Sequence, residues 1–268
     1  MPRGSLDRET LEAINGKLPD ILGLQRLIHQ MSITGLSMKL GPKSRLPIAA
    51  VCLDDAAWAL AEARYALHES FAEPLWYRTK SIPPNEVSAL IFGKFFADDM
   101  ALRFYTAVEH LAESLVFMLG IKEADLKRYA KGRMASRASI VGSYLRKEKP
   151  DHVVTKAIEQ LLDSKDYQFT VRYRNEWVHN QPPKIKGTGL TFERRTRWHE
   201  REVGGHKAHI LTFGGGDEPK YTLDLLQERF LNSLKVLVEC VGRVTDFFVK
   251  QLAKHDIVIT DKGGSTTL

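Results

Sequence analysis

Apolar residues recur every three or four positions along much of this 268-residue chain, which is the spacing of one buried face of an α-helix. The longest such series runs from Leu223 to Leu252 without a miss and predicts a final helix about 45 Å long. Its members are Leu223, Leu226, Phe230, Leu234, Leu237, Val241, Val244, Phe248 and Leu252. We expect this helix to be the central helix of a helical bundle.

Two more long helices are predicted earlier in the chain. An alanine-rich run with apolar residues at helical spacing covers residues 46–71, and Pro74 is expected to end it because proline lacks a backbone N–H. Pro83-Pro84-Asn85-Glu86 then opens a second helix, whose apolar face continues to Gly120. Shorter helices are expected at about 124–131, 136–147 and 153–162.

The stretch 166–183, with the sequence DYQFTVRYRNEWVHNQPP, is compatible with two structures. Alternate residues from Tyr167 to Tyr173 are aromatic or β-branched, as in a strand, whereas Phe169, Tyr173 and Trp177 fall at helical spacing. The capping residues just before it and its helical surroundings favour a helix. The two prolines at its end must terminate that helix.

Residues 184–220 break the helical pattern. Two segments, 190–199 and 206–213, flank Gly204-Gly205 and predict a β-hairpin inserted in a helical protein. Its three histidines have no cysteine nearby and fit no common zinc spacing, so no metal site is predicted. Two interpretations of the hairpin stay open: a basic flap that touches RNA or a dimer partner, or a solvated hairpin without specific contacts.

Together these elements predict an all-α fold, an up-and-down helical bundle with one inserted β-hairpin. Residues 45–255 are expected to form the helical domain, with the hairpin at about 184–220. A partly helical N-terminal extension, 1–44, precedes this domain, and a C-terminal tail, 256–268, follows it.

The cysteines and the apolar runs indicate where the protein works. Cys52 and Cys240 each lie in an apolar helical run and match no metal spacing, which favours two buried thiols in a reducing compartment. The longest apolar run, residues 47–53, is too short to span a bilayer. A cytoplasmic protein without a membrane partner is therefore expected, and no cofactor motif is found.

Basic residues are concentrated in residues 122–149, which carry nine basic and three acidic side chains. This local excess equals the net charge of +6 of the whole chain. It fits either a solvated helical face or a track for an RNA backbone. The RNA-binding candidates are Lys127, Arg128, Lys131, Arg133 and Arg137 here, and Arg194, Arg195 and Arg197 in the hairpin.

Three side chains in the stretch 166–183 suit metal-free chemistry on a phosphodiester. The guanidinium of Arg174 can hold phosphate oxygens and stabilise charge that develops on them. The imidazole of His179 titrates near neutrality, so it can exchange protons with a ribose hydroxyl. Asn175 can donate and accept hydrogen bonds, and it shares a helix face with His179, whereas Arg174 lies about 140° from His179.

The string Arg174-Asn175-x-x-x-His179, late in a helical chain and ahead of a long last helix, resembles the motif of the HEPN superfamily, Arg-x(4–6)-His with a polar residue after the arginine. Six Arg/His pairs in the chain have that spacing. Only Arg174/His179 has a polar residue after the arginine and also lies in a predicted helix. The other five pairs are Arg103/His110, Arg146/His152, Arg172/His179, Arg194/His199 and Arg201/His206.

This resemblance implies a helical bundle that forms a homodimer with both motifs facing one cleft. In active members it implies a metal-independent endoribonuclease in a toxin, antiviral or RNA-processing role, with an antitoxin or regulatory protein as a further partner. Arg174, Asn175 and His179 would then be the catalytic residues. The alternative is a non-catalytic helical module that binds RNA, a nucleotide or a protein.

Overall fold

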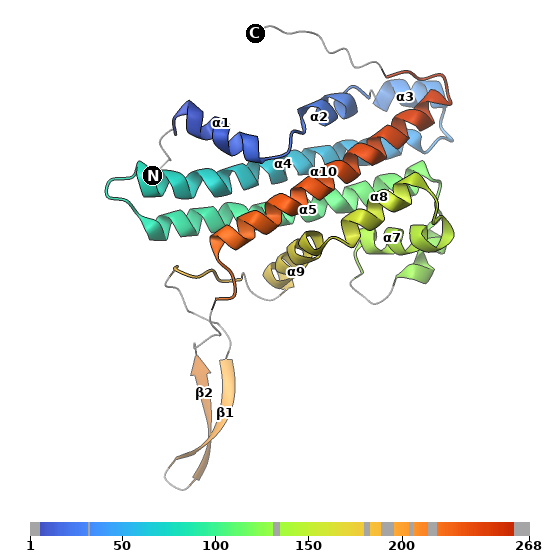
Figure 1. The fold of residues 1–268 in the computed structure, drawn as a ribbon. Coiled ribbons are helices and arrows are strands. Elements are labelled where there is room, and N and C mark those ends of the chain that lie inside the picture. The colour runs from blue at the N-terminus through green and yellow to red at the C-terminus, as the bar shows by residue number, and fades with distance from the viewer. Residues whose placement is uncertain are drawn as a thin grey trace.

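The computed structural model describes residues 6–31, 33–130, 135–179, 183–188, 196–203, 206–213 and 219–259, without side chains for 196–213 except that of Lys207. The described chain is mostly helical, as the apolar spacing predicts. Two long helices, α4 (Leu46–Thr79) and α5 (Glu86–Met118), form an antiparallel pair, and α10 (Leu223–Ala253) crosses over both of them (Figure 1).

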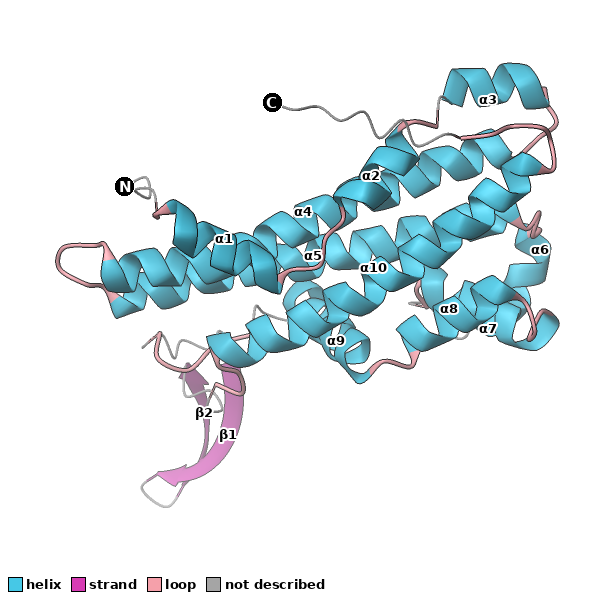
Figure 2. Cartoon of the chain, turned by 45° about the horizontal axis from the view of Figure 1, so that its top comes forward, coloured by secondary structure: helices cyan, strands magenta, loops and turns pink. Residues whose placement is uncertain are grey.

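Shorter helices cover this central trio on two sides. One group, α1 (Arg8–Lys17), α2 (Leu22–His29) and α3 (Ile33–Leu40), packs on α4. A second group, with α7 (Arg137–Glu148), α8 (Val153–Leu162) and α9 (Lys165–His179), packs on α5, on α10 and on itself (Figures 1 and 2). Between α5 and α7 lie the short helix α6 (Glu123–Leu126) and the 3-10 turn η1 (Lys127–Tyr129).

The prediction that Pro74 ends the first long helix is wrong, because α4 continues through this proline to Thr79. Pro74 cannot donate to the carbonyl oxygen of Ser70, four residues earlier. That oxygen instead accepts a hydrogen bond of 2.6 Å from Nε2 of Gln227 on α10. A buried side chain of another helix thus replaces the missing backbone bond, which a local sequence rule does not anticipate.

The three long helices α4, α5 and α10 approach one another closely in the same region. A Cβ atom added to Gly93 of α5 would lie 2.5 Å from Cδ2 of Leu223 and 2.6 Å from Cγ of Pro74. Ser70 ties α4 to this point, since its hydroxyl donates to the carbonyl oxygen of Gly93 at 2.9 Å. Glycine is therefore required here for packing and not for its backbone angles.

Several helix predictions are confirmed. The stretch that carries the Arg-Asn-His string is the helix α9, and not a strand. The helix expected at 153–162 is α8, and the long final series is α10. Ser136 and Thr222 begin α7 and α10 as capping residues, because their side chains accept from backbone N–H groups of the first turn.

Two strands, β1 (Thr196–Val203) and β2 (His206–Phe213), lie in the segment that interrupts the helical pattern. They pair antiparallel, from Thr196 opposite Phe213 to Val203 opposite His206, and project from the helices (Figure 2). Among the described elements, the two strands contact only each other. The Gly204-Gly205 turn lies outside the described residues.

At the base of this insertion, Ile185 and Tyr221 form a parallel bridge, and the N–H of Lys186 donates to the carbonyl oxygen of Tyr221 at 2.8 Å. Both ends of the insertion therefore lie side by side. Elsewhere, Cys52 and Cys240 are free thiols, half-buried and buried respectively. None of the helices in the described ranges is both long and apolar enough to cross a membrane.

Candidate functional site on helix α9

Helix α9 is fixed against α5 by a buried carboxylate. Asp98 of α5 accepts hydrogen bonds from the hydroxyl of Tyr173 at 2.5 Å and from Nε1 of Trp177 at 3.1 Å. It also forms an ion pair with Lys94, one turn earlier on α5, at 2.6 Å. Burial raises the pKa of Asp98, against the opposing effects of Lys94 and the two aromatic donors.

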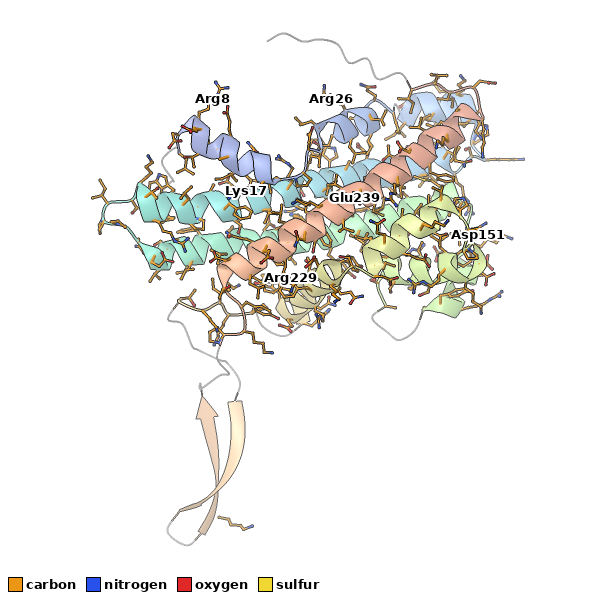
Figure 3. The ribbon with its side chains drawn as sticks, viewed as in Figure 1. Arg8, Lys17, Arg26, Asp151, Arg229 and Glu239 are labelled. Carbon is orange, nitrogen blue, oxygen red and sulfur yellow. The ribbon has the colours of Figure 1, made fainter. Side chains whose placement is uncertain are left out.

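A second ion pair holds the start of α9 against α10. Nη1 of Arg229 lies 2.7 Å from a carboxylate oxygen of Asp166, and Figure 3 shows Arg229 at the end of α10 that passes α9. Thr170 and Ser233 exchange a further buried hydrogen bond of 2.7 Å between the two helices. These contacts and the Asp98 cluster set the rotation of α9, and with it the direction of the candidate residues.

Arg174 points along the side of α9 toward α5. Its guanidinium carbon lies 4.0 Å from the ring centroid of Tyr105, which is a close cation–π stack. Its Nη1 donates to the side-chain oxygen of Asn175 at 3.0 Å. The Nε atom is buried and has no hydrogen-bond partner within the described part of the chain.

No carboxylate pairs with Arg174 among the described residues, in contrast to three other arginines that pack against α9 or the neighbouring helices. Arg137, Arg146 and Arg229 each form short ion pairs with one or two carboxylates. Arg174 is half-buried and relies on an aromatic ring and an amide. A guanidinium in such a position has the charge and the free donors to bind an anion.

Tyr105 belongs to α5, and charged side chains around it act on its hydroxyl. Burial raises the pKa of the Tyr105 hydroxyl, and Glu109 adds to this, whereas Arg174 opposes it. Glu109 does not reach for Arg174, because its carboxylate accepts from the backbone N–H groups of Arg137 at 2.9 Å and Ala138 at 3.2 Å. The carboxylate of Glu109 therefore binds the first turn of α7 and does not neutralise Arg174.

His179 is the last residue of α9 and is exposed. No contact of its ring is found among the described residues. Asn175 lies one turn earlier and is half-buried, so it is the residue between the guanidinium and the imidazole. Because α9 is a regular helix, Arg174 and His179 point about 140° apart around its axis, and one chain does not bring them together on one face.

The predicted RNA-binding residues have different surroundings. Lys127 and Arg128 are exposed in η1, and Arg128 lies 3.8 Å from Asp125. Arg137 is a structural ion-pair residue, with its three guanidinium nitrogens bonded to Glu113 and Glu123. Lys131, Arg133, Arg194 and Arg195 lie outside the described residues, and for Arg197 only the backbone in β1 is described.

Sequence reasoning missed the residues that support this site from α5. Tyr105, Asp98 and Lys94 were not singled out, although all three lie in the predicted helix that continues to Gly120. One signal was present, since Lys94 and Asp98 form a charged pair one turn apart inside a strongly apolar helix. A buried charged pair in such a run indicates a polar contact with another element.

Comparison of the chain with protein-family models, curated proteins and solved structures finds no match in any of the three. These comparisons therefore assign neither a family nor a function to the chain.

Proposed function

We propose that this protein is a metal-independent endoribonuclease with an HEPN-like helical bundle, acting through Arg174, Asn175 and His179 in a toxin, antiviral or RNA-processing role. The main support for this proposal is the half-buried guanidinium of Arg174. Among the described residues, its buried Nε has no hydrogen-bond partner and no carboxylate forms an ion pair with it. Such a cation is incompletely compensated, and a phosphate would supply both the charge and the acceptors.

The stack on Tyr105 favours this use of Arg174. A ring at 4.0 Å covers one face of the guanidinium, so further ligands approach along its edge, where the N–H groups point. Asn175 takes one of the edge donors and fixes the rotation of the group. Arg174 is thus oriented before any ligand arrives, which lowers the entropic cost of binding a phosphate.

In the proposed reaction the ribose 2′-oxygen attacks the adjacent phosphorus, and the bond from phosphorus to the 5′-oxygen breaks. A histidine takes the proton from the 2′-hydroxyl, and a second acid returns a proton to the leaving 5′-oxygen. Arg174 stabilises the charge on the non-bridging oxygens. The products are a 2′,3′-cyclic phosphate and a 5′-hydroxyl.

A homodimer would solve the geometric difficulty of this site. Arg174 and His179 diverge by about 140° on a helix, and one exposed imidazole cannot serve as acid and base at once. Two copies related by a two-fold axis beside α9 would bring two arginines and two histidines to one cleft. The antitoxin or regulatory protein implied by the family resemblance belongs to the same proposal.

The test is incubation of the protein with mixed RNA in excess EDTA. We expect cleavage that leaves cyclic phosphate ends, reduced by about 100-fold or more in His179→Ala and by at least about tenfold in Arg174→Lys. The matched control is Arg172→Ala, which removes an exposed arginine from the same helix and should cut at the wild-type rate. Absence of cleavage, or equal cleavage by His179→Ala, would contradict the proposal.

The dimer is tested by mixing two inactive variants. His179→Ala chains and Arg174→Ala chains together should be more active than the sum of the two separate variants, because each hybrid dimer brings one arginine and one histidine to the shared cleft. Activity of the mixture equal to the sum of the separate variants, or sedimentation of the wild type as a monomer at the assay concentration, would exclude the composite site.

A second candidate function is RNA or nucleotide binding without chemistry. It is favoured by the divergence of Arg174 and His179 within one chain, since the anion site then stands without an adjacent acid or base. In this case RNA would bind with a steep dependence on salt, Arg174→Lys would weaken binding, and His179→Ala would change nothing.

A further inference from the structure

One side of α4 is exposed and unusually apolar. Its solvent-facing stripe in residues 48–65 steps by three and four and consists of Ile48, Val51, Asp55, Trp58, Glu62 and Tyr65. Four of these six side chains are large and apolar, and Trp58 and Tyr65 are 56% and 62% exposed. The other sides of α4 contact α5, α10 and the helices α1 to α3.

Helix α10 provides an internal comparison. It is equally long and also lies on the outside of the bundle, yet every fully exposed residue from Asp224 to Lys250 is charged. Glu239, which Figure 3 labels, is one of them. The exposed positions of α10 are therefore charged, whereas most of those in the stripe of α4 are large and apolar.

Ion pairs connect the stripe of α4 to an exposed part of α5. Nη1 of Arg103 lies 2.8 Å from Glu62 of the α4 stripe, and its Nε lies 3.3 Å from Asp99. Phe95 is one turn before Asp99 on the same side of α5 and is 62% exposed. We call this continuous surface, formed by the α4 stripe with Phe95, Asp99 and Arg103, the hairpin face, after the antiparallel pair of helices α4 and α5. It does not include the strands β1 and β2.

We propose that the hairpin face binds an amphipathic helix of another protein, one whose apolar stripe is flanked by Lys and Arg. The three-and-four spacing of the α4 stripe matches the spacing of apolar residues on a second helix laid beside it. From Ile48 to Tyr65 the stripe is about 26 Å long, which fits a partner helix of about 18 residues.

Charge complementarity selects this occupant over a second copy. The hairpin face carries Asp55, Glu62 and Asp99 against Arg103, a formal charge of −2 in a chain of +6. Asp55 has no ion-pair partner among the described residues. A second copy using the same surface would oppose −2 to −2, whereas basic residues beside the apolar stripe of a partner helix would pair with these carboxylates. This proposal does not depend on ribonuclease activity.

The probe is a synthetic 18-residue helix with leucines at three-and-four spacing and flanking lysines, beside a counterpart with flanking glutamates. Titration of each peptide into the full-length protein, followed by calorimetry, should give a micromolar dissociation constant for the lysine peptide. The glutamate peptide should bind at least about tenfold more weakly. Equal affinity for both peptides, or no binding of the lysine peptide, would overturn the proposal.

Protein variants separate the apolar and the charged contributions. Tyr65→Ser with Phe95→Ser should weaken the lysine peptide at least about tenfold, and Asp55→Lys should weaken it several-fold while improving the glutamate peptide. Met38→Ser is the matched control and should bind like the wild type, because Met38 is 83% exposed on α3 and is not part of the hairpin face.

Sedimentation tests whether a second copy of this chain, and not another protein, occupies the hairpin face. If the wild type is a dimer that Tyr65→Ser with Phe95→Ser converts to a monomer, the hairpin face holds a second copy and the proposal is wrong. An unchanged oligomeric state in this variant, together with the loss of peptide binding, supports it. Asp55→Lys alters a single exposed side chain, so it still decides the outcome if the double variant fails to fold.

Discussion

The hydroxyl of Tyr173 donates to the carboxylate of Asp98, a side chain that is 14% exposed. Asp98 has three donors, namely Tyr173, Trp177 and Lys94, and each compensates part of the cost of removing this carboxylate from water. Two of the three donors come from α9, although they are 75 and 79 residues away from Asp98 along the chain. This single residue therefore anchors the helix that carries the candidate site.

We expect Tyr173→Phe to lower the free energy of unfolding by about 1–3 kcal/mol, because it leaves a buried carboxylate with one donor fewer. Tyr65→Phe is the control, since the Tyr65 hydroxyl is exposed, and it should leave stability unchanged. Urea unfolding followed by circular dichroism measures both. Equal stability of the two variants would show that the hydrogen bond to Asp98 contributes nothing net.

The thiols give a second prediction for single residues. Burial raises the pKa of Cys52 to about 11 and that of Cys240 to about 12. Only a thiolate reacts, so at pH 8 about one Cys52 side chain in a thousand is reactive in the folded protein. A disulfide reagent should therefore modify neither thiol rapidly at pH 8 and both after unfolding in guanidinium chloride.

The rate at Cys52 should rise roughly tenfold per pH unit between pH 8 and pH 10, because this range lies below its raised pKa. A rate that rises only about tenfold in total and levels off above about pH 9 would mean that the thiol ionises at its ordinary pKa. Rapid reaction of both folded thiols at pH 8 would contradict the burial of Cys240.

At the scale of elements, the bundle depends on how closely α4, α5 and α10 approach at Gly93. Helix α5 has no room for a side chain here, since Leu223 and Pro74 occupy the space. The interior of α4 accepts Pro74 only because Gln227 of α10 satisfies the carbonyl oxygen of Ser70. Three helices thus depend on one contact region, in which each tolerates an irregularity of another.

We expect Gly93→Ala to destabilise the protein by about 1–3 kcal/mol, because the new methyl group forces shifts in a packed core. Gly242→Ala in α10 is the matched control. Nothing lies within 4 Å of a Cβ atom at Gly242, so alanine should stabilise the helix there by up to about 1 kcal/mol. Thermal melting of both variants would refute this account if the two shifts had the same sign.

At the scale of the whole molecule, the helices and the strand pair are separate in their contacts. Among the described elements, β1 and β2 touch only each other, and the bridge between Ile185 and Tyr221 already joins the ends of the insertion. A two-stranded ribbon is marginally stable by itself in water. The ribbon is therefore expected to serve binding and not the stability of the bundle.

Replacing residues 189–218 by a short glycine linker should leave the helical content and the cooperative melting transition unchanged within a few degrees. If the basic residues of this insertion contact RNA, the same deletion should weaken RNA binding and flatten its dependence on salt. Circular dichroism and a salt titration of RNA binding measure the two effects. Loss of cooperative melting would show that the insertion is part of the core.

The helical class and the positions of α8, α9 and α10 could be predicted from the sequence, because apolar spacing is a local property of each segment. The sequence also placed Arg174, Asn175 and His179 on one helix. Their chemical types followed from the residues alone, and so did the angle of about 140° between Arg174 and His179.

The surroundings of these residues could not be predicted in this way, because they form only when the chain folds. The ring of Tyr105 over Arg174, the carboxylate of Asp98 under α9 and the bond from Gln227 that lets α4 pass Pro74 all join distant parts of the chain. No local pattern encodes such partners, because a side chain's periodicity tells which way it faces and not what it meets. The exposed stripe of α4 could not be predicted for the same reason, since an apolar residue is predicted as core until the packing of the described chain shows how much of it stays exposed.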